Sequence, residues 1–249
     1  MEMRLFDNWH AYLWPGVSTE EMQSYGNNAN TYVIAGALPR GRHVIIDPGQ
    51  VANGSRQRCL ERLLEGMEGD GLRIEDTGLI INTHGHPDHY GAAAAIREKS
   101  RARVTIGRTE YRSMTEFRRQ VAGQPGMDAS MMPELEVDFL LQEGDLDLEG
   151  GITLQILSIP GHSPGHIGLY WPEGKIFAGG DLVFNGSTGR ADLPGGDARL
   201  LKESVERVSG LEIEYLLTGH QYGAPGIIQG AEAVERNFAF IRTNIFPHL

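Results

Sequence analysis

The most informative stretch of this sequence is residues 83–91, Thr83-His84-Gly85-His86-Pro87-Asp88-His89-Tyr90-Gly91, in which three histidines and one aspartate fall within six residues. It follows the apolar run 79–83, which is typical of a buried strand, and precedes the alanine-rich run 91–99, which favours a helix. Imidazole and carboxylate groups are ligands that suit zinc, iron and manganese. Because the whole chain has nine histidines, we interpret this cluster as a metal site rather than an ordinary polar loop.

Composition predicts a single globular domain over residues 1–249, since 40% of the residues are hydrophobic and 22% are charged. The net charge of −11 disfavours a nucleic-acid partner. No apolar run approaches the ~20 residues needed to cross a bilayer, and the amino terminus does not resemble a signal peptide, so we expect no membrane partner and a cytoplasmic location. The single cysteine, Cys59, excludes an intrachain disulfide and is expected to be a buried thiol.

Short apolar runs alternate with helical patterns in both halves of the chain. The runs predicted as strands are 31–35, 43–47, 79–83, 104–106, 152–159, 167–171, 175–178 and 215–218, with a turn at 39–41. The runs predicted as helices are 55–68, 91–99, 110–121, 198–208 and 227–240, with a loop at 123–133. This order predicts an α/β protein built as an αββα sandwich, two β-sheets packed together with helices outside.

The motif H-x-H-x-D-H after a strand resembles the signature of the metallo-β-lactamase superfamily. Further signatures of that superfamily follow in the same order along the chain, namely 44–49 with Asp47, 160–166 with His162 and His166, 179–181 with Asp181, and 218–220 with His220. The resemblance covers residues 44–220 and implies two mixed sheets flanked by helices.

Carried over position by position, the resemblance implies a site for two divalent metal ions, with zinc expected and iron or manganese as alternatives. It places His84, His86 and His162 on the first ion. It places Asp88, His89 and His220 on the second, with Asp181 bridging and with Asp88 and Asp181 as the catalytic carboxylates. Asp47 and His166 would orient these ligands rather than bind metal.

A further stretch resembles the glyoxalase II-like branch, which also contains persulfide dioxygenases. Residues 186–197 are similar to its G-R-x-D-x-x-G-G loop, and Tyr222 is similar to a substrate-contacting tyrosine. Arg190 would bind a substrate carboxylate or, equally, form a structural ion pair with Asp192. Residues 221–249 are too few for the helical domain that glyoxalase II carries after this point, so the chain looks more like the shorter relatives of that enzyme.

Three functions follow from the resemblance. The first is a metal-dependent hydrolase of a small thioester or ester, in which metal-activated water attacks a carbonyl. The second is a persulfide dioxygenase with a single Fe(II) on His84, His162 and Asp181. The third and weakest is a non-catalytic metal-binding module. The expected partner is a small-molecule substrate. The methionines at 114, 127, 131 and 132 would fill the core or cover the pocket, and the apolar carboxyl terminus leaves a homodimer open.

Overall fold

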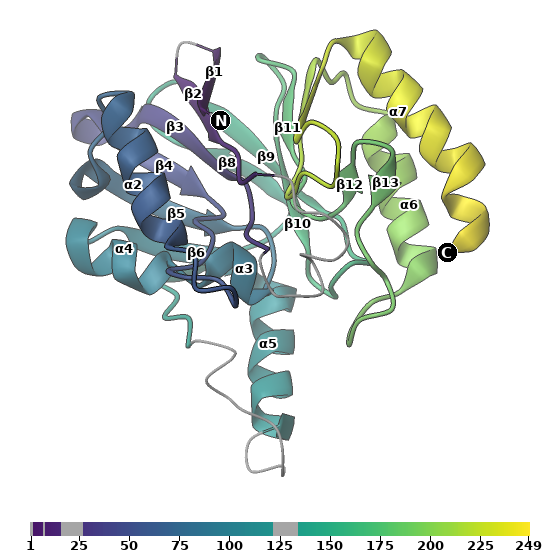
Figure 1. The fold of residues 1–249 in the computed structure, drawn as a ribbon, viewed down its shortest axis with the longest axis horizontal. Helices are drawn as coiled ribbons and strands as arrows, with labels where there is room; N and C mark the ends of the chain where they lie inside the picture. The colour runs from purple at the N-terminus through teal and green to yellow at the C-terminus, as the bar shows by residue number, and fades with distance from the viewer. Residues whose placement is uncertain (1, 7, 16–26, 122–133) are drawn as a thin grey trace.

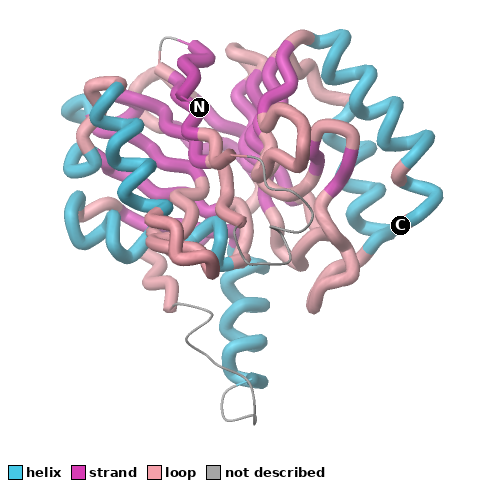
Figure 2. Tube along the Cα trace, in the orientation of Figure 1, coloured by secondary structure: helices cyan, strands magenta, loops and turns pink. Residues whose placement is uncertain are grey.

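Two β-sheets stack face to face, with helices on both outer faces (Figures 1 and 2). The structure is a computed structural model that describes residues 2–6, 8–15, 27–121 and 134–249. Side chains alternate along the strands, so that Val44 and Ile46 face the core between the sheets while Ile45 faces the helices. This period of two is what a strand buried on both faces requires.

The first sheet has seven strands in the order β1-β2-β3-β4-β5-β6-β7. Their bounds are β1 Glu2–Phe6, β2 Trp9–Tyr12, β3 Thr31–Leu38, β4 Arg42–Ile46, β5 Thr77–Asn82, β6 Arg103–Gly107 and β7 Phe139–Leu141. Strands β1 to β4 pair antiparallel, and β4 to β7 pair parallel. The parallel half therefore brings the carboxyl ends of β4 and β5 to one edge, where Asp47 and the 83–91 loop follow.

The second sheet has six strands in the order β15-β14-β11-β10-β9-β8. Their bounds are β8 Gly144–Asp147, β9 Thr153–Ser158, β10 Ile167–Trp171, β11 Ile176–Ala178, β14 Tyr215–Leu217 and β15 Ile227–Gln229. The pair β11 and β14 is parallel and the other pairs are antiparallel. A separate hairpin joins β12 (Val183–Phe184) and β13 (Ser187–Thr188).

Helices cover each sheet on the side away from the other. The helices against the first sheet are α2 Cys59–Gly69, α3 Pro87–Tyr90, α4 Ala93–Ser100 and α5 Arg108–Val121. Those against the second are α6 Ala198–Ser209 and α7 Ala231–Asn244. In the described residues, short 3₁₀ helices span Pro39–Gly41, Ile74–Asp76 and Phe246–His248. Helix α5 packs against the body at its start and then projects from it (Figure 1).

The predicted αββα sandwich is confirmed, and two of the predicted helices are corrected. Residues 227–229 form strand β15 rather than the start of a helix, because they pair with β14, and Gly230 at φ 99° separates β15 from α7. The helix predicted at 55–68 begins at Cys59, because Arg56 is left-handed (φ 61°) and Asn53 accepts a hydrogen bond from the Gln57 amide (3.0 Å). The loop predicted at 123–133 lies outside the described residues.

The remaining differences lie at chain ends and in short elements. Strands β1, β2, β7, β8, β12 and β13 are not predicted from the sequence, and they are short or lie at sheet edges. At the carboxyl terminus Phe238 and Ile241 pack into the core beneath α7, whereas the Phe240 side chain is 48% exposed. In the described part of the chain no helix combines the length and the apolar character that a membrane crossing needs.

Candidate metal centre

Four loops that follow strands bring the predicted ligands to one edge of the sandwich. His84, His86, Asp88 and His89 follow β5; His162 follows β9; Asp181 follows β11; and His220 follows β14. Backbone hydrogen bonds join the two sheets here, from the Ile167 amide to the Thr83 carbonyl (3.0 Å) and from the Asn30 amide to the Gly219 carbonyl (2.7 Å). The site is therefore built between the sheets rather than on one of them.

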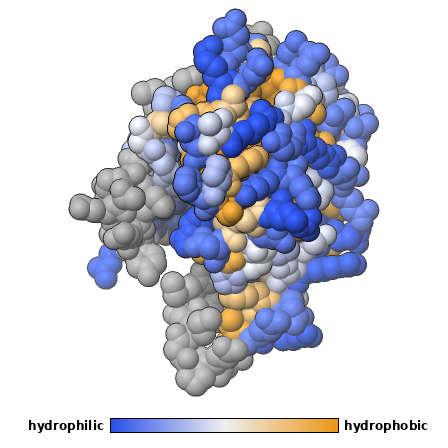
Figure 3. Space-filling view, turned by 90° about the vertical axis from the view of Figure 1, so that its right-hand side faces the viewer, coloured by the Kyte–Doolittle hydropathy of each residue, from blue (hydrophilic) through white to orange (hydrophobic). Residues whose placement is uncertain are grey.

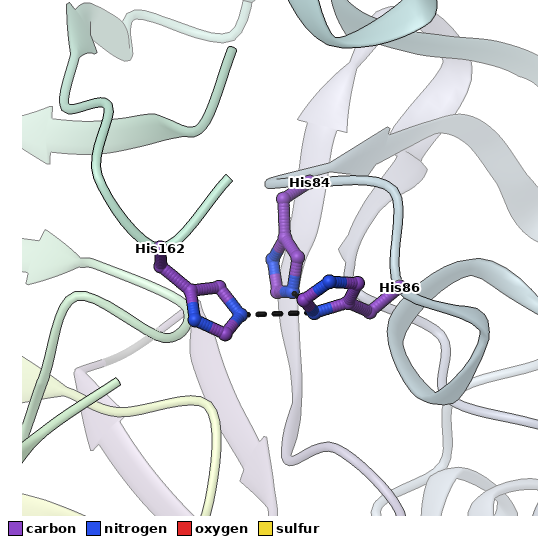
Figure 4. A group of neighbouring side chains, drawn as sticks. All are labelled: His84, His86 and His162. Carbon is purple, nitrogen blue, oxygen red and sulfur yellow. Dashed lines mark hydrogen bonds between the residues drawn. The ribbon is translucent and has the colours of Figure 1, made fainter. Parts of the chain in front are cut away.

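Three histidines form the first group of ligand atoms (Figure 4). His86 Nδ1 lies 3.1 Å from His84 Nε2 and 2.9 Å from His162 Nε2. His84 and His162 are almost fully buried and come from different sheets. The three rings point toward one another in Figure 4, so their nitrogens converge on one position.

The second group contains Asp88, His89 and His220. His220 Nε2 lies 3.2 Å from His89 Nε2 and 3.2 Å from Asp88 Oδ2. Asp181 lies between the groups, because its Oδ1 is 3.2 Å from His89 Nε2 and its Oδ2 is 3.5 Å from His162 Nε2. The structure thus brings all seven predicted ligands together, in three overlapping groups, one of which joins His84, His89 and Asp181.

Hydrogen bonds at the far side of four rings show which nitrogens face the centre. The pairs are His84 Nδ1 with Thr83 Oγ1 (3.0 Å), His89 Nδ1 with Asp47 Oδ2 (2.8 Å), His162 Nδ1 with the Arg190 carbonyl (2.8 Å) and His220 Nδ1 with the Asn28 carbonyl (3.1 Å). A carbonyl or carboxylate only accepts, and the Thr83 hydroxyl already donates to Asp47 Oδ2 (2.7 Å), so each Nδ1 is the donor. Each Nε2 therefore faces the centre and is the nitrogen that would bind a metal ion.

The charges of the cluster favour cations. Burial, followed by the charge of neighbouring histidines, lowers the pKa of His84 well below its usual value and that of His86 to about 4. Burial opposes protonation of His220 too, but the carboxylates of Asp181 and Asp88 raise its pKa to about 9. Burial likewise opposes the charge of both aspartates, yet their contacts with histidines keep both pKa values low. The centre therefore holds two carboxylates, and a metal ion would displace any proton on His220.

These residues fit two divalent ions of the transition-metal type. The donors are five imidazole nitrogens and two carboxylates, in overlapping groups whose ligand atoms lie within 4.8 Å of one another. Asp181 Oδ1 is buried and has no hydrogen-bond partner among the described residues, as expected for an oxygen reserved for a cation. The chemistry of the donor set is thus compatible with a di-metal site.

Asp47 makes hydrogen bonds to residues that position the histidines of the centre. Its backbone is left-handed (φ 51°), which is uncommon for a residue with a side chain. The carboxylate accepts hydrogen bonds from the Thr83 amide (2.7 Å) and hydroxyl and from His89 Nδ1. Asp47 therefore holds the His89 ring directly and the His84 ring through the Thr83 hydroxyl.

The prediction missed Glu110, a buried glutamate of α5. Its Oε1 accepts from the Gly85 amide (2.8 Å), and its Oε2 accepts from the Ser163 hydroxyl (2.9 Å) and the Gly165 amide (2.7 Å). One carboxylate thus ties the loop of His84 and His86 to the loop of His162. A Cβ on Gly165 would lie 2.0 Å from the Glu110 amide, so glycine lets this loop approach α5. No sequence signal connects residues so far apart in the chain.

The other predicted site residues lie around this centre. His166 is fully buried and belongs to none of the three ligand groups; neither ring nitrogen has a hydrogen-bond partner among the described residues. The Tyr222 ring stacks on His220, with 5.3 Å between ring centroids. Arg190 pairs with both carboxylate oxygens of Asp192, at 2.8 Å each, which is the structural alternative weighed from the sequence. Whether Arg190 also binds substrate stays a prediction.

A cavity of about 470 Å³ opens over the centre. It is lined by ligand residues and by the side chains predicted to contact substrate, namely His86, Asp88, His162, Asp181, Arg190 and Tyr222. Polar groups converge at the bottom of this concave space, which is typical of a small-molecule site.

The comparisons with known proteins agree with this geometry. The family model described as "Metallo-beta-lactamase superfamily" matches residues 25–220. Hydroxyacylglutathione hydrolase GloC of Haemophilus influenzae is 35% identical over 164 residues, which are 65% of this chain and 70% of that protein. A solved structure of TTHA1623 in a di-iron-bound form is 31% identical, with a TM-score of 0.62 over 84% of this chain and 93% of that one. ETHE1 from Myxococcus xanthus, 23% identical, shares the fold with a TM-score of 0.60 over 88% of this chain and 86% of that one. The chain belongs to the metallo-β-lactamase superfamily.

Proposed function

We propose that the protein is a metal-dependent hydrolase of small thioesters or esters. The observation that carries the proposal is the position of Asp181, whose two carboxylate oxygens lie next to histidines of both ligand groups. Seven donors in two linked groups suit two ions, and a pair of ions suits hydrolysis at a carbonyl. The likeness to a hydroxyacylglutathione hydrolase and to a di-iron-bound structure supports both parts of the proposal.

Each side chain has a distinct role in this proposal. His84, His86 and His162 would hold one ion, and Asp88, His89 and His220 the other, with Asp181 shared. The bound ions would lower the pKa of a water molecule and polarise the substrate carbonyl. The Asp88 side chain is 24% exposed and that of Asp181 is 9% exposed, so Asp88 is the more open of the two carboxylates to a bound substrate. Tyr222 and Arg190 would contact the polar part of the substrate.

The test replaces the shared carboxylate. We expect Asp181→Ala to lose turnover of a thioester and ester panel and to retain about one metal ion per chain instead of two, measured by elemental analysis. Asp145→Ala, at an exposed position on β8, is the matched control and should keep both properties. An Asp181→Ala protein that keeps full activity and full metal content would overturn the proposal.

A persulfide dioxygenase is the second candidate, because His84, His162 and Asp181 contain the two histidines and one carboxylate that a single Fe(II) requires. His162 Nε2 lies 3.5 Å from Asp181 Oδ2, which is close enough for both groups to bind the same ion, and this supports the second candidate. Oxygen uptake by the iron-loaded protein with glutathione persulfide, together with one iron per chain and no thioester turnover, would replace the hydrolase with this activity. No oxygen uptake would end this candidate. A non-catalytic metal-binding role would require that neither reaction occurs.

A further inference from the structure

A second cavity lies beside the metal centre, along helix α5. It has a volume of about 560 Å³, and we call it the α5 cavity. It shares His86, Pro87 and Leu193 with the cavity over the metal centre, so the two spaces adjoin. A molecule bound at the centre can therefore extend one of its ends toward α5.

Apolar side chains form a large part of the wall of the α5 cavity. Residues 113, 114, 117 and 120 recur at the spacing of one helix face, and they turn that face of α5 to the cavity. The apolar lining residues are Pro87, Met114, Phe117, Pro164, Leu193 and Pro194. Figure 3 shows apolar side chains gathered where α5 projects from the body of the protein. Such a wall favours a hydrocarbon group over a hydrated one.

The charges around the two cavities also favour an uncharged group in the α5 cavity. Among the described residues that line them, Arg190 is the one permanently charged cation, and it is already paired with Asp192. The α5 cavity itself carries two carboxyl groups, that of Glu110, which accepts three hydrogen bonds, and that of Glu116, which pairs with Arg119. An anionic substrate arm would lose its hydration and gain no unpaired cation among the described lining residues, whereas an uncharged arm needs no such partner.

We propose that the α5 cavity binds the acyl chain of the substrate, and that the preferred substrates carry an uncharged aliphatic acyl group of several carbons. This proposal rests on the hydrolase function proposed above. Hydrolysis breaks the bond between the acyl carbon and the sulfur or oxygen; water supplies the hydroxyl group of the acid and the proton of the released thiol or alcohol. The polar thiol or alcohol half lies toward Arg190 and Tyr222.

A chain-length series tests the proposal on the full-length, metal-loaded protein. The substrates are N-acetylcysteamine thioesters with acetyl, butyryl, hexanoyl and octanoyl groups. We expect kcat/KM to rise roughly two- to fourfold for each methylene that enters the cavity. Ser113→Trp fills the cavity and should bring the octanoyl-to-acetyl ratio of kcat/KM close to one.

The matched control is Thr115→Trp, because Thr115 is exposed on the same helix and does not line the cavity. This variant should keep the chain-length preference. Binding of the non-hydrolysable thioether S-octyl-N-acetylcysteamine, measured by calorimetry, gives a readout that does not depend on catalysis. It should bind wild type and Thr115→Trp more tightly than Ser113→Trp, by about 10-fold or more.

The outcomes separate this proposal from the hydrolase on which it rests. Thioester turnover without chain-length preference, or with a preference that Ser113→Trp leaves intact, would overturn the acyl-chain assignment and leave the hydrolase standing. A preference that follows the length of the thiol half instead would overturn it as well. Ser113-dependent binding of the octyl thioether, with no thioester or ester turned over, would overturn the hydrolase and keep the cavity as an apolar binding site.

Discussion

Replacing Glu110 with glutamine should weaken both the fold and the metal centre. All three contacts of this carboxylate come from donors, the amides of Gly85 and Gly165 and the Ser163 hydroxyl. A glutamine side chain offers one acceptor oxygen, and its NH₂ group would face a donor. If the oxygen keeps Ser163 and Gly165, the buried Gly85 amide loses its partner, which costs about 1–3 kcal/mol in the free energy of unfolding. Glu110→Ala leaves both amides unpaired and should cost roughly 2–6 kcal/mol.

The effect should extend to metal binding, because Gly85 lies between His84 and His86. Loss of a residue that orients metal ligands typically weakens binding about 10- to 100-fold. Urea unfolding at saturating metal would measure the first effect, and chelator competition the second. Glu116→Gln, on the same helix with a side chain 49% exposed, is the control and should resemble wild type. Unfolding free energy and metal affinity of Glu110→Gln equal to wild type would refute the assigned role.

Three further outcomes can be measured. Gly219→Ala should lose metal, because the added Cβ would lie 2.1 Å from Asp181 Oδ1. In the control Gly210→Ala the nearest atom to the added Cβ would be 3.5 Å away, so this variant should keep its metal. Equal metal contents in the two variants would contradict this prediction. Hydrogen bonds from α6 lower the pKa of Glu143 from 4.5 to about 2, so its contribution to stability is present above pH 4.5 and is lost as the pH falls through about 2. The difference in unfolding free energy between wild type and Glu143→Gln, at most about 1 kcal/mol, should therefore shrink as the pH falls from 4.5 to about 2. A difference that stays constant with pH would count against the contact between Glu143 and Arg207. Burial raises the pKa of the Cys59 thiol to about 11, so iodoacetamide should label the native protein slowly at pH 7 and the urea-unfolded protein rapidly; fast native labelling would show that the thiol is accessible.

Local patterns carry their own physical signal, and this is why much of the fold could be predicted. A strand buried on both sides needs a continuous apolar run, which residues 79–83 display, and the cluster from His84 to His89 directly follows it. Strand β15 could not be predicted in this way. Its three residues have no local signal that separates a strand from the first turn of a helix, and pairing with β14 determines the outcome.

By itself, the sequence determined which candidate ligand types are present, their order along the chain and the layers that carry them, because these depend on side-chain chemistry and on short-range periodicity. Only the tertiary structure decided which nitrogen of each ring faces the centre, since the acceptors that orient His162 and His220 are carbonyls of the distant residues Arg190 and Asn28. It also decided that Glu110 joins two loops, that the Arg190 guanidinium pairs with Asp192, and that a cavity opens along α5. A hydrogen bond or a cavity wall between segments far apart in the chain depends on distances in the folded molecule, and no residue pattern within one segment encodes them.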